Sequence, residues 1–199
     1  MLKHITIEGV RNLAYAQVAL PAGATVLFGA NGSGKTSFLE AIHLLAVGRS
    51  FRTHQSKPVI QHGMAHCRVV GEVQRGGRAT IMGLEKHRDG GVKARVGGEN
   101  VPSLSELALH LPLVLLDTEG LGIVTGPPEG RRRLLDGTLF HVEQGFLSQW
   151  KRYALAVRQR NSGLRRGILG SDRAWRQEIA ATGTLLTQQR QAVAEKLAH

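Results

Sequence analysis

The N-terminal part of the chain alternates between polar and apolar positions, the pattern of strands with one buried face. Residues 2–9 and 15–20 form two such runs, and a turn leads to a third, wholly apolar run over 25–28. We therefore expect three strands before residue 29. Residues 36–47 carry apolar side chains at helical spacing with no breaker, which predicts a largely buried helix that ends at Gly48.

A different pattern follows over residues 65–101, where short β-like runs are separated by Gly-Gly and Asp-Gly turns. This arrangement predicts an antiparallel meander. A short helix is expected over 103–110, and the apolar run 113–116 has the composition of a buried strand.

Beyond two prolines at 127 and 128 the apolar positions recur every three or four residues, which predicts one long helix with a packed stripe. The stripe consists of Leu135, Leu139, Val142, Phe146, Trp150, Tyr153 and Val157. A glycine-containing hinge over 160–171 precedes a final helix that runs to the last residue. We expect a lobe over 1–126 and a helical subdomain over 127–199 that is truncated at its C-terminus.

The segment GANGSGKT at 29–36 matches the phosphate-binding pattern G-x-x-x-x-G-K-[ST], between a predicted strand and a predicted helix. Its glycines let successive backbone N–H groups face phosphates, Lys35 brings a positive charge to them, and Thr36 offers a hydroxyl to Mg²⁺. We predict a nucleotide-binding site formed by Gly29, Ala30, Asn31, Gly32, Ser33, Gly34, Lys35, Thr36 and Ser37.

Hydrolysis would also need an acidic residue near the metal ion. The run 113–116 followed by Asp117 has the shape of a Walker B strand, and residues 117–120 match the D-x-x-G of GTPases. No N-K-x-D or T-K-x-D element occurs in the sequence, so a guanine-specific enzyme is not indicated. A self-contained small P-loop NTPase that uses Asp117 stays open as an alternative.

The chain is strongly basic, with 26 Lys and Arg against 15 Asp and Glu among 199 residues and a net charge of +11, which predicts attraction to a polyanion. A single cysteine excludes an intramolecular disulfide, and we find neither a signal peptide nor an apolar run that could span a bilayer. We expect a cytoplasmic protein with no membrane partner.

Two groups of arginines are candidates for contact with nucleic acid. Arg49 and Arg52 flank Phe51, which suits phosphates beside one stacked base, although a packed phenylalanine between solvated arginines is equally consistent. Arg131, Arg132 and Arg133 open a helix, where cations are unfavourable, so they contact either phosphate or nearby acids such as Glu129 and Asp136.

Several segments together resemble the RecF family, relatives of the ABC-type ATPase heads of SMC and Rad50 proteins. They are IEGVRNL near the N-terminus, LFGANGSGKTSFLEAI, GRSFRT at 48–53, TEGL at 118–121, GPPEGRRRLLD at 126–136 and RQRNSGLR at 158–165. The fold implied is an α/β P-loop NTPase lobe of the ABC/SMC head type, with an antiparallel β meander and a helical subdomain.

The resemblance implies an ATP- and Mg²⁺-binding protein of DNA repair and replication, active in recombinational gap repair and the SOS response. Such proteins bind single-stranded DNA or single–double-strand junctions, form ATP-dependent homodimers when complete, and help RecR- and RecO-like mediators load recombinase. By position, Arg11 and Asn12 belong to the element near the phosphates.

Two departures qualify the resemblance. The S-P-E or T-P-E element of the family is D-T-E at 117–119, and RecF-like chains are roughly twice this length. No S-x-G-Q signature motif occurs here, so we expect weak ATP binding and poor hydrolysis. A DNA-binding module that does not respond to nucleotide is the second alternative.

Overall fold

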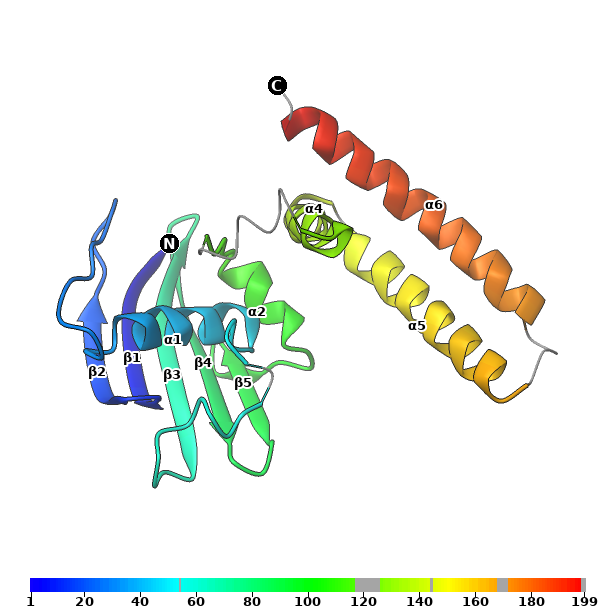
Figure 1. Ribbon diagram of the computed structural model, residues 1–199. Helices are drawn as coiled ribbons and strands as arrows, with labels where there is room; N and C mark the ends of the chain where they lie inside the picture. Colours follow the sequence, from blue (N-terminus) through cyan, green and yellow to red (C-terminus); the bar gives the residue numbers. More distant parts are fainter. Residues whose placement is uncertain (54, 117–125, 144, 168–171, 198–199) are drawn as a thin grey trace. The chain divides into compact units, whose positions relative to one another are not determined.

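A six-stranded antiparallel sheet organises the N-terminal half of the protein in a computed structural model that describes residues 1–53, 55–116, 126–143, 145–167 and 172–197 (Figure 1). The chain divides into two units, residues 1–114 and residues 115–199. The boundary after residue 126 that we drew from the sequence stays a prediction.

The sheet has the strand order β2-β1-β3-β4-β5-β6. Its strands are β1 (Leu2–Val10), β2 (Leu13–Ala19), β3 (His66–Arg75), β4 (Arg78–His87), β5 (Val92–Val96) and β6 (Glu99–Asn100). Each strand pairs antiparallel with its neighbour, so the first two predicted strands and the predicted meander are confirmed. The N-terminal hairpin and the meander form one sheet because β1 pairs with both β2 and β3.

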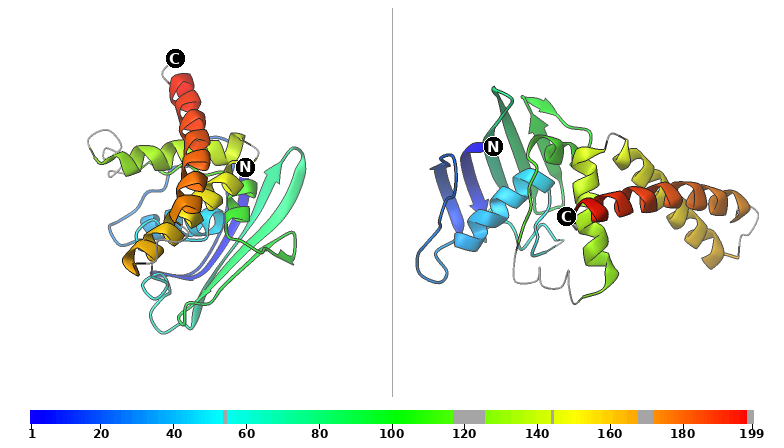
Figure 2. Two further views of the ribbon diagram at one scale, coloured as in Figure 1. Left: turned by 90° about the vertical axis from the view of Figure 1, so that its right-hand side faces the viewer. Right: turned by 90° about the horizontal axis from the view of Figure 1, so that it is seen from above.

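Helix α1 (Lys35–Val47) lies along one face of this sheet (Figure 2). Alternate residues of a strand point to opposite faces, and the apolar set of β1 and β4 faces the helix. Ile5, Ile7 and Met82 are fully buried there with Leu44 and Leu45 of α1. Each such side chain contributes roughly 1.5–3 kcal/mol by leaving water, so this layer supplies most of the stability of the unit.

The two predicted helices around this core form and end where predicted, although the second begins at Ser105, two residues later than expected. Gly48 ends α1 in the left-handed region, at φ 76°, and its N–H donates to the carbonyl of Leu44. The expected short helix is α2 (Ser105–His110), which packs against α1 through the buried Leu107.

Two predicted strands do not form. Residues 25–28 and 113–116 have no strand conformation, and Phe28 and Leu116 are 92% and 83% exposed. A strand is stabilised by hydrogen bonds to a neighbouring strand, and the described residues supply none for either segment. Both runs are largely exposed here, so the burial that their apolar composition predicted is not observed.

The second unit is built from α4 (Pro128–Val142), α5 (Phe146–Arg165) and α6 (Asp172–Leu197). The prediction of one long helix is wrong, because Gly145 adopts φ 85° and starts α5 after the end of α4. The predicted hinge is also shorter, since α5 continues through Gly163 to Arg165.

The apolar core of this unit contains Leu139, Phe146, Leu186 and Val193, with Tyr153 packed against it. Trp150, which we expected to be packed, is 41% exposed. Among the described helices none is long and apolar enough to cross a membrane.

Two glycines of the sheet provide a matched test of its two faces. A Cβ built on Gly71 would lie 2.5 Å from Leu45 Cδ2, on the side of α1, whereas one on Gly83 would meet only Val70 at 3.9 Å. We predict that Gly71→Val lowers the free energy of unfolding by about 1–3 kcal/mol through overpacking. Gly83→Val should leave it unchanged or raise it slightly. Urea denaturation measures both, and equal effects would contradict the assigned faces.

Candidate nucleotide-binding site

The loop over residues 29–36 has a backbone that only glycine adopts easily at three positions. Gly29, Gly32 and Gly34 have φ angles of 147°, 80° and 97°. At Gly34 space is a second constraint, because a Cβ would lie 2.6 Å from Leu13 Cδ2. The glycines of the motif are therefore required by conformation, and at Gly34 by the close approach of β2 as well.

The loop leads directly into the N-terminus of α1, which begins at Lys35. Gly34, the residue before it, gives no side-chain cap, and the first turn contains no acidic residue. The N–H groups of this turn and the positive end of the helix dipole are thus left for an anion. Thr36 is exposed, and its hydroxyl has no protein partner in the described residues, which suits a Mg²⁺ ligand.

Lys35 folds back over the loop that precedes it. Its Nζ donates hydrogen bonds of 2.8 Å to the carbonyls of Gly29 and Ala30. The ammonium charge is therefore held at the loop, where phosphate oxygens bound by the loop N–H groups would meet it. Asn31 and Ser33 are exposed at the same loop, and the Ser33 N–H donates to Ala30 at 3.2 Å.

Asn12 holds the loop from the side of the sheet. It lies in the turn between β1 and β2, and its Nδ2 donates to the Gly32 carbonyl at 2.6 Å. Its Oδ1 accepts a hydrogen bond of 2.6 Å from the hydroxyl of Ser37. Ser37, which we expected at the nucleotide, is buried and occupied in this contact, so in this structure it braces the loop.

Behind the loop, the fully buried carboxylate of Glu40 interacts with Arg11, Ser50 and Arg52. Arg11 donates to it with both Nε and Nη2, at 2.9 and 2.8 Å, in a bidentate ion pair. Ser50 Oγ also donates to Glu40, and Arg52 Nη1 lies 3.7 Å from its Oε2. Arg11 therefore engages a protein carboxylate, while its neighbour Asn12 contacts the loop.

The ionised form of Glu40 is favoured by this environment. Burial by itself raises the pKa of Glu40, but the hydrogen bonds from Arg11 and Ser50 and the charges of Arg11 and Arg52 outweigh it. The pKa consequently lies below the ordinary value of the carboxyl group. Glu40 is thus negatively charged, and two other segments of the chain supply the cations and hydrogen-bond donors that stabilise this charge.

One of those segments is the loop over residues 49–53. Ser50 Oγ accepts hydrogen bonds from the N–H groups of Arg52 and Thr53, at 2.9 and 3.1 Å. His43 of α1 makes a 2.6 Å hydrogen bond to the Arg49 carbonyl. Burial lowers the pKa of His43. The Arg49 side chain is exposed and makes no hydrogen bond or ion pair to described residues, so of the two candidates for DNA contact it is the freer one.

The arginines at the start of α4 have different surroundings. Arg132 pairs with Glu129, as one of the two alternatives predicted, and Arg131 donates to the Gly126 carbonyl at 3.1 Å. Arg133 is exposed and makes no such contact in the described region. Asp136, the other predicted acid, instead forms a bidentate pair with Arg190 of α6 at 2.7 and 2.9 Å.

Some of the predicted chemistry cannot be placed. Asp117 and residues 118–121 lie outside the described residues. Sequence reasoning also missed Glu40, although one signal was present: a carboxylate among the apolar residues of a helix expected to be buried.

The glycine loop, the uncapped helix and the sheet beneath it define an α/β P-loop lobe of the type found in ABC and SMC ATPase heads. The chain belongs to the RecF/RecN/SMC N-terminal domain family, whose sequence model matches residues 1–148.

Within that family the chain is similar to proteins named DNA replication and repair protein RecF. It is 41% identical to the protein of Stutzerimonas stutzeri, in an alignment that covers 98% of this chain and 54% of that protein. Identity to the Azotobacter vinelandii protein is 44%, over 89% of this chain and 50% of the relative. The chain thus spans about half the length of these relatives.

Solved structures agree with this placement. The recombination mediator protein RecF with ATP, of the RecFOR pathway, matches with a TM-score of 0.88 and 25% identity, over 98% of this chain and 54% of that one. The fold is shared with an Smc head bound to the winged-helix domain of ScpA, with a TM-score of 0.58 and 18% identity over 76% and 56% of the two chains.

The contacts of Glu40 predict that replacing this residue destabilises the protein and changes how its stability depends on pH. Glu40→Gln leaves the guanidinium of Arg11 without its counter-charge, so we expect the free energy of unfolding at pH 7 to fall by about 3 kcal/mol. Because the pKa of Glu40 is lowered on folding, the wild-type contribution is complete above the unfolded pKa of about 4.3 and is lost as the pH falls through the folded value.

The variant lacks this term and should lose less stability than the wild type below about pH 4.3. Urea denaturation at a series of pH values measures both effects. Glu99→Gln, an exposed carboxyl on β6, is the control. If the free energy of unfolding falls equally with decreasing pH in the wild type and in Glu40→Gln, Glu40 is not an ionised, paired carboxylate.

Proposed function

We propose that the chain is the ATP-binding lobe of a DNA replication and repair protein of the RecF type. The observation that carries this proposal is the loop at 29–36, which leads into a helix N-terminus with no side-chain cap and over which the Lys35 ammonium lies. The likeness to RecF with ATP supports ATP as the nucleotide.

The residues present fit ATP with Mg²⁺. The backbone of 29–34 would surround the phosphates, Lys35 would neutralise their charge, and Thr36 would contribute its hydroxyl to the metal ion. Asn12 and Ser37 would keep the loop in shape from behind. Mg²⁺ would supply charge neutralisation at the phosphates.

DNA is the proposed macromolecular partner. A net charge of +11 favours a polyanion, and Arg49 and Arg133 are exposed cations free of ion pairs within the described residues. In the complete protein we propose binding to single-stranded DNA or gap junctions, an ATP-dependent homodimer, and work with RecR- and RecO-like mediators in recombinase loading. The RecFOR pathway named for the solved relative supports this direction.

ATP binding should depend on Lys35. We predict that Lys35→Ala weakens the affinity for ATP·Mg²⁺ by about 10- to 100-fold, because a charge-assisted contact contributes about 1.5–3 kcal/mol. Titration with a fluorescent ATP analogue measures the effect. Lys151→Ala, which removes an exposed lysine from α5, should bind like the wild type.

Hydrolysis separates this proposal from a self-contained NTPase. We expect ATP turnover by residues 1–199 to equal that of Lys35→Ala, since the sequence contains no signature motif. Robust turnover that is lost in both Lys35→Ala and Asp117→Asn would overturn the proposal in favour of the small NTPase.

The control of DNA binding by nucleotide is the decisive test. We predict that ATP·Mg²⁺ strengthens binding of the chain to labelled single-stranded DNA, measured by fluorescence anisotropy, and that Lys35→Ala abolishes this response. Affinity should fall steeply with salt, because phosphate contacts release counterions. Binding that ignores ATP would instead support a nucleotide-independent DNA-binding module.

A further inference from the structure

The face of the sheet opposite α1 carries a concentration of charge. Helices α1 and α2 both pack on the other face (Figure 2), and the described part of residues 1–114 places no helix on this one. We call it the open face. Strand alternation directs Arg68 of β3, Gly83 and Glu85 of β4, and Lys93 and Arg95 of β5 onto it.

Strand register arranges these residues in two adjacent rows. Arg68 lies opposite Glu85, and Glu85 opposite Lys93, so one row crosses three strands. In the next row Gly83 lies opposite both Val70 and Arg95. Lys93 ends the first row and Arg95 ends the second, both on β5. Because they are two residues apart on this strand, their backbone positions are about 6.6 Å apart.

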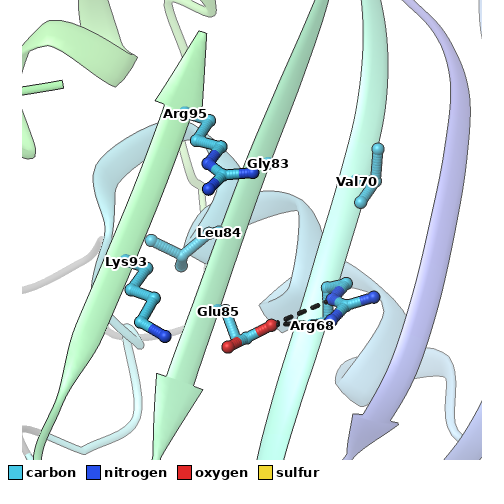
Figure 3. A pocket seen from close by; sticks show the side chains of 7 residues that line it. All are labelled: Arg68, Val70, Gly83, Leu84, Glu85, Lys93 and Arg95. Carbon is cyan, nitrogen blue, oxygen red and sulfur yellow. Dashed lines mark hydrogen bonds and ion pairs between the residues drawn. The ribbon is translucent and has the colours of Figure 1, made fainter. Parts of the chain in front are cut away.

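The missing side chain at Gly83 creates a shallow hollow of about 470 Å³ between the rows. Figure 3 shows Arg95 extending from β5 towards Gly83, with Lys93 and the Arg68–Glu85 pair beside it. Nothing nearby fills the space, because a Cβ on Gly83 would meet only Val70 at 3.9 Å. Three of the seven residues that line the hollow are thus cationic, and one is acidic.

The one carboxylate in the hollow is already compensated. Glu85 accepts two hydrogen bonds from Arg68, at 2.8 and 3.0 Å, and makes a 2.8 Å contact with His87 Nε2. These contacts, led by the one from Arg68, hold the pKa of Glu85 below its ordinary value.

Two cations are left over. Lys93 is exposed and forms no hydrogen bond or ion pair with any described residue. Arg95 donates only to the neutral amide of Asn100, at 3.0 Å. The three basic residues of the hollow therefore exceed its single acid by two charges.

Two imidazole rings continue the same face beyond Arg68 and Glu85. His66 and His87 lie opposite each other in the β3–β4 ladder, with ring centroids 5.5 Å apart. Flat rings on the same face as two unpaired cations form a combination that can bind single-stranded nucleic acid, in which bases stack and phosphates meet charge.

We propose that the open face, centred on Gly83, Lys93 and Arg95, binds the phosphodiester backbone of single-stranded nucleic acid. This inference rests on the proposed function for its choice of partner, but it assigns the contact to residues other than the arginines that the sequence suggested. An acidic protein segment is the competing occupant. The hollow is disfavoured for it because it offers no deep apolar pocket for peptide side chains.

The test removes the two free cations together. We predict that the double variant Lys93→Gln/Arg95→Gln binds a 30-nucleotide single strand about tenfold more weakly at low salt. The slope of log K against log salt should be smaller by about 1.4, or 0.7 for each lost phosphate contact. Gly83→Glu, which keeps every cation but adds a negative charge to the hollow, should also weaken binding.

Three controls accompany the test. Arg78→Gln/Arg173→Gln removes the same net charge from exposed residues that do not belong to this face and should lose little affinity. Lys93→Arg should bind like the wild type. Binding of ATP and thermal unfolding should be unchanged in the double variant, since neither residue contacts α1 or the core.

The outcomes separate the two proposals. Loss of affinity in the double variant and in Gly83→Glu, but not in the control variants, supports the open face. Equal binding by all variants overturns it while the proposed function stands. If the wild type binds no DNA, both fail. If a glutamate-rich peptide displaces the DNA at equal charge concentration, the face selects charge only, and the nucleic-acid assignment is overturned.

Discussion

A buried carboxylate cannot stay charged in a protein interior without cationic partners, and this requirement at Glu40 fixes much of the N-terminal lobe. Its partner Arg11 belongs to the turn between β1 and β2, at a φ of 55° that side chains rarely adopt. The ion pair holds this turn against α1, and Asn12 in the same turn then reaches the carbonyl of Gly32. The shape of the phosphate loop therefore depends on the Arg11–Glu40 ion pair, which lies about one helical turn beyond the loop.

The elements that could be predicted from the sequence are those determined by local pattern. Alternation marked the strands around the core, and Gly48 marked the end of α1 because a left-handed residue stops a helix. The runs at 25–28 and 113–116 were misjudged because a strand also needs a partner, which local composition does not reveal. The apolar stripe through Gly145 was misleading because its spacing continues across the break between α4 and α5.

The candidate site shows the same division between local and tertiary information. The motif identified Lys35 and Thr36 because the chemistry of phosphate binding requires consecutive residues. The contacts of Ser37 and Glu40 could not be foreseen, since both depend on a turn more than twenty residues away. A carboxylate inside an apolar helix was the available signal, but the identity of its cationic partner is a property of the fold.

The two faces of the sheet have separate proposed roles, although the same strands supply both. On β4, Met82 and Leu84 belong to the core, while Gly83 and Glu85, which alternate with them, belong to the open face. Adjacent residues of a strand point in opposite directions, so a substitution on one face leaves the packing of the other intact. The support of the phosphate loop and the charge presented to a polyanion can therefore vary independently. This separation would allow the proposed nucleotide binding and the proposed nucleic-acid binding to be tested one at a time.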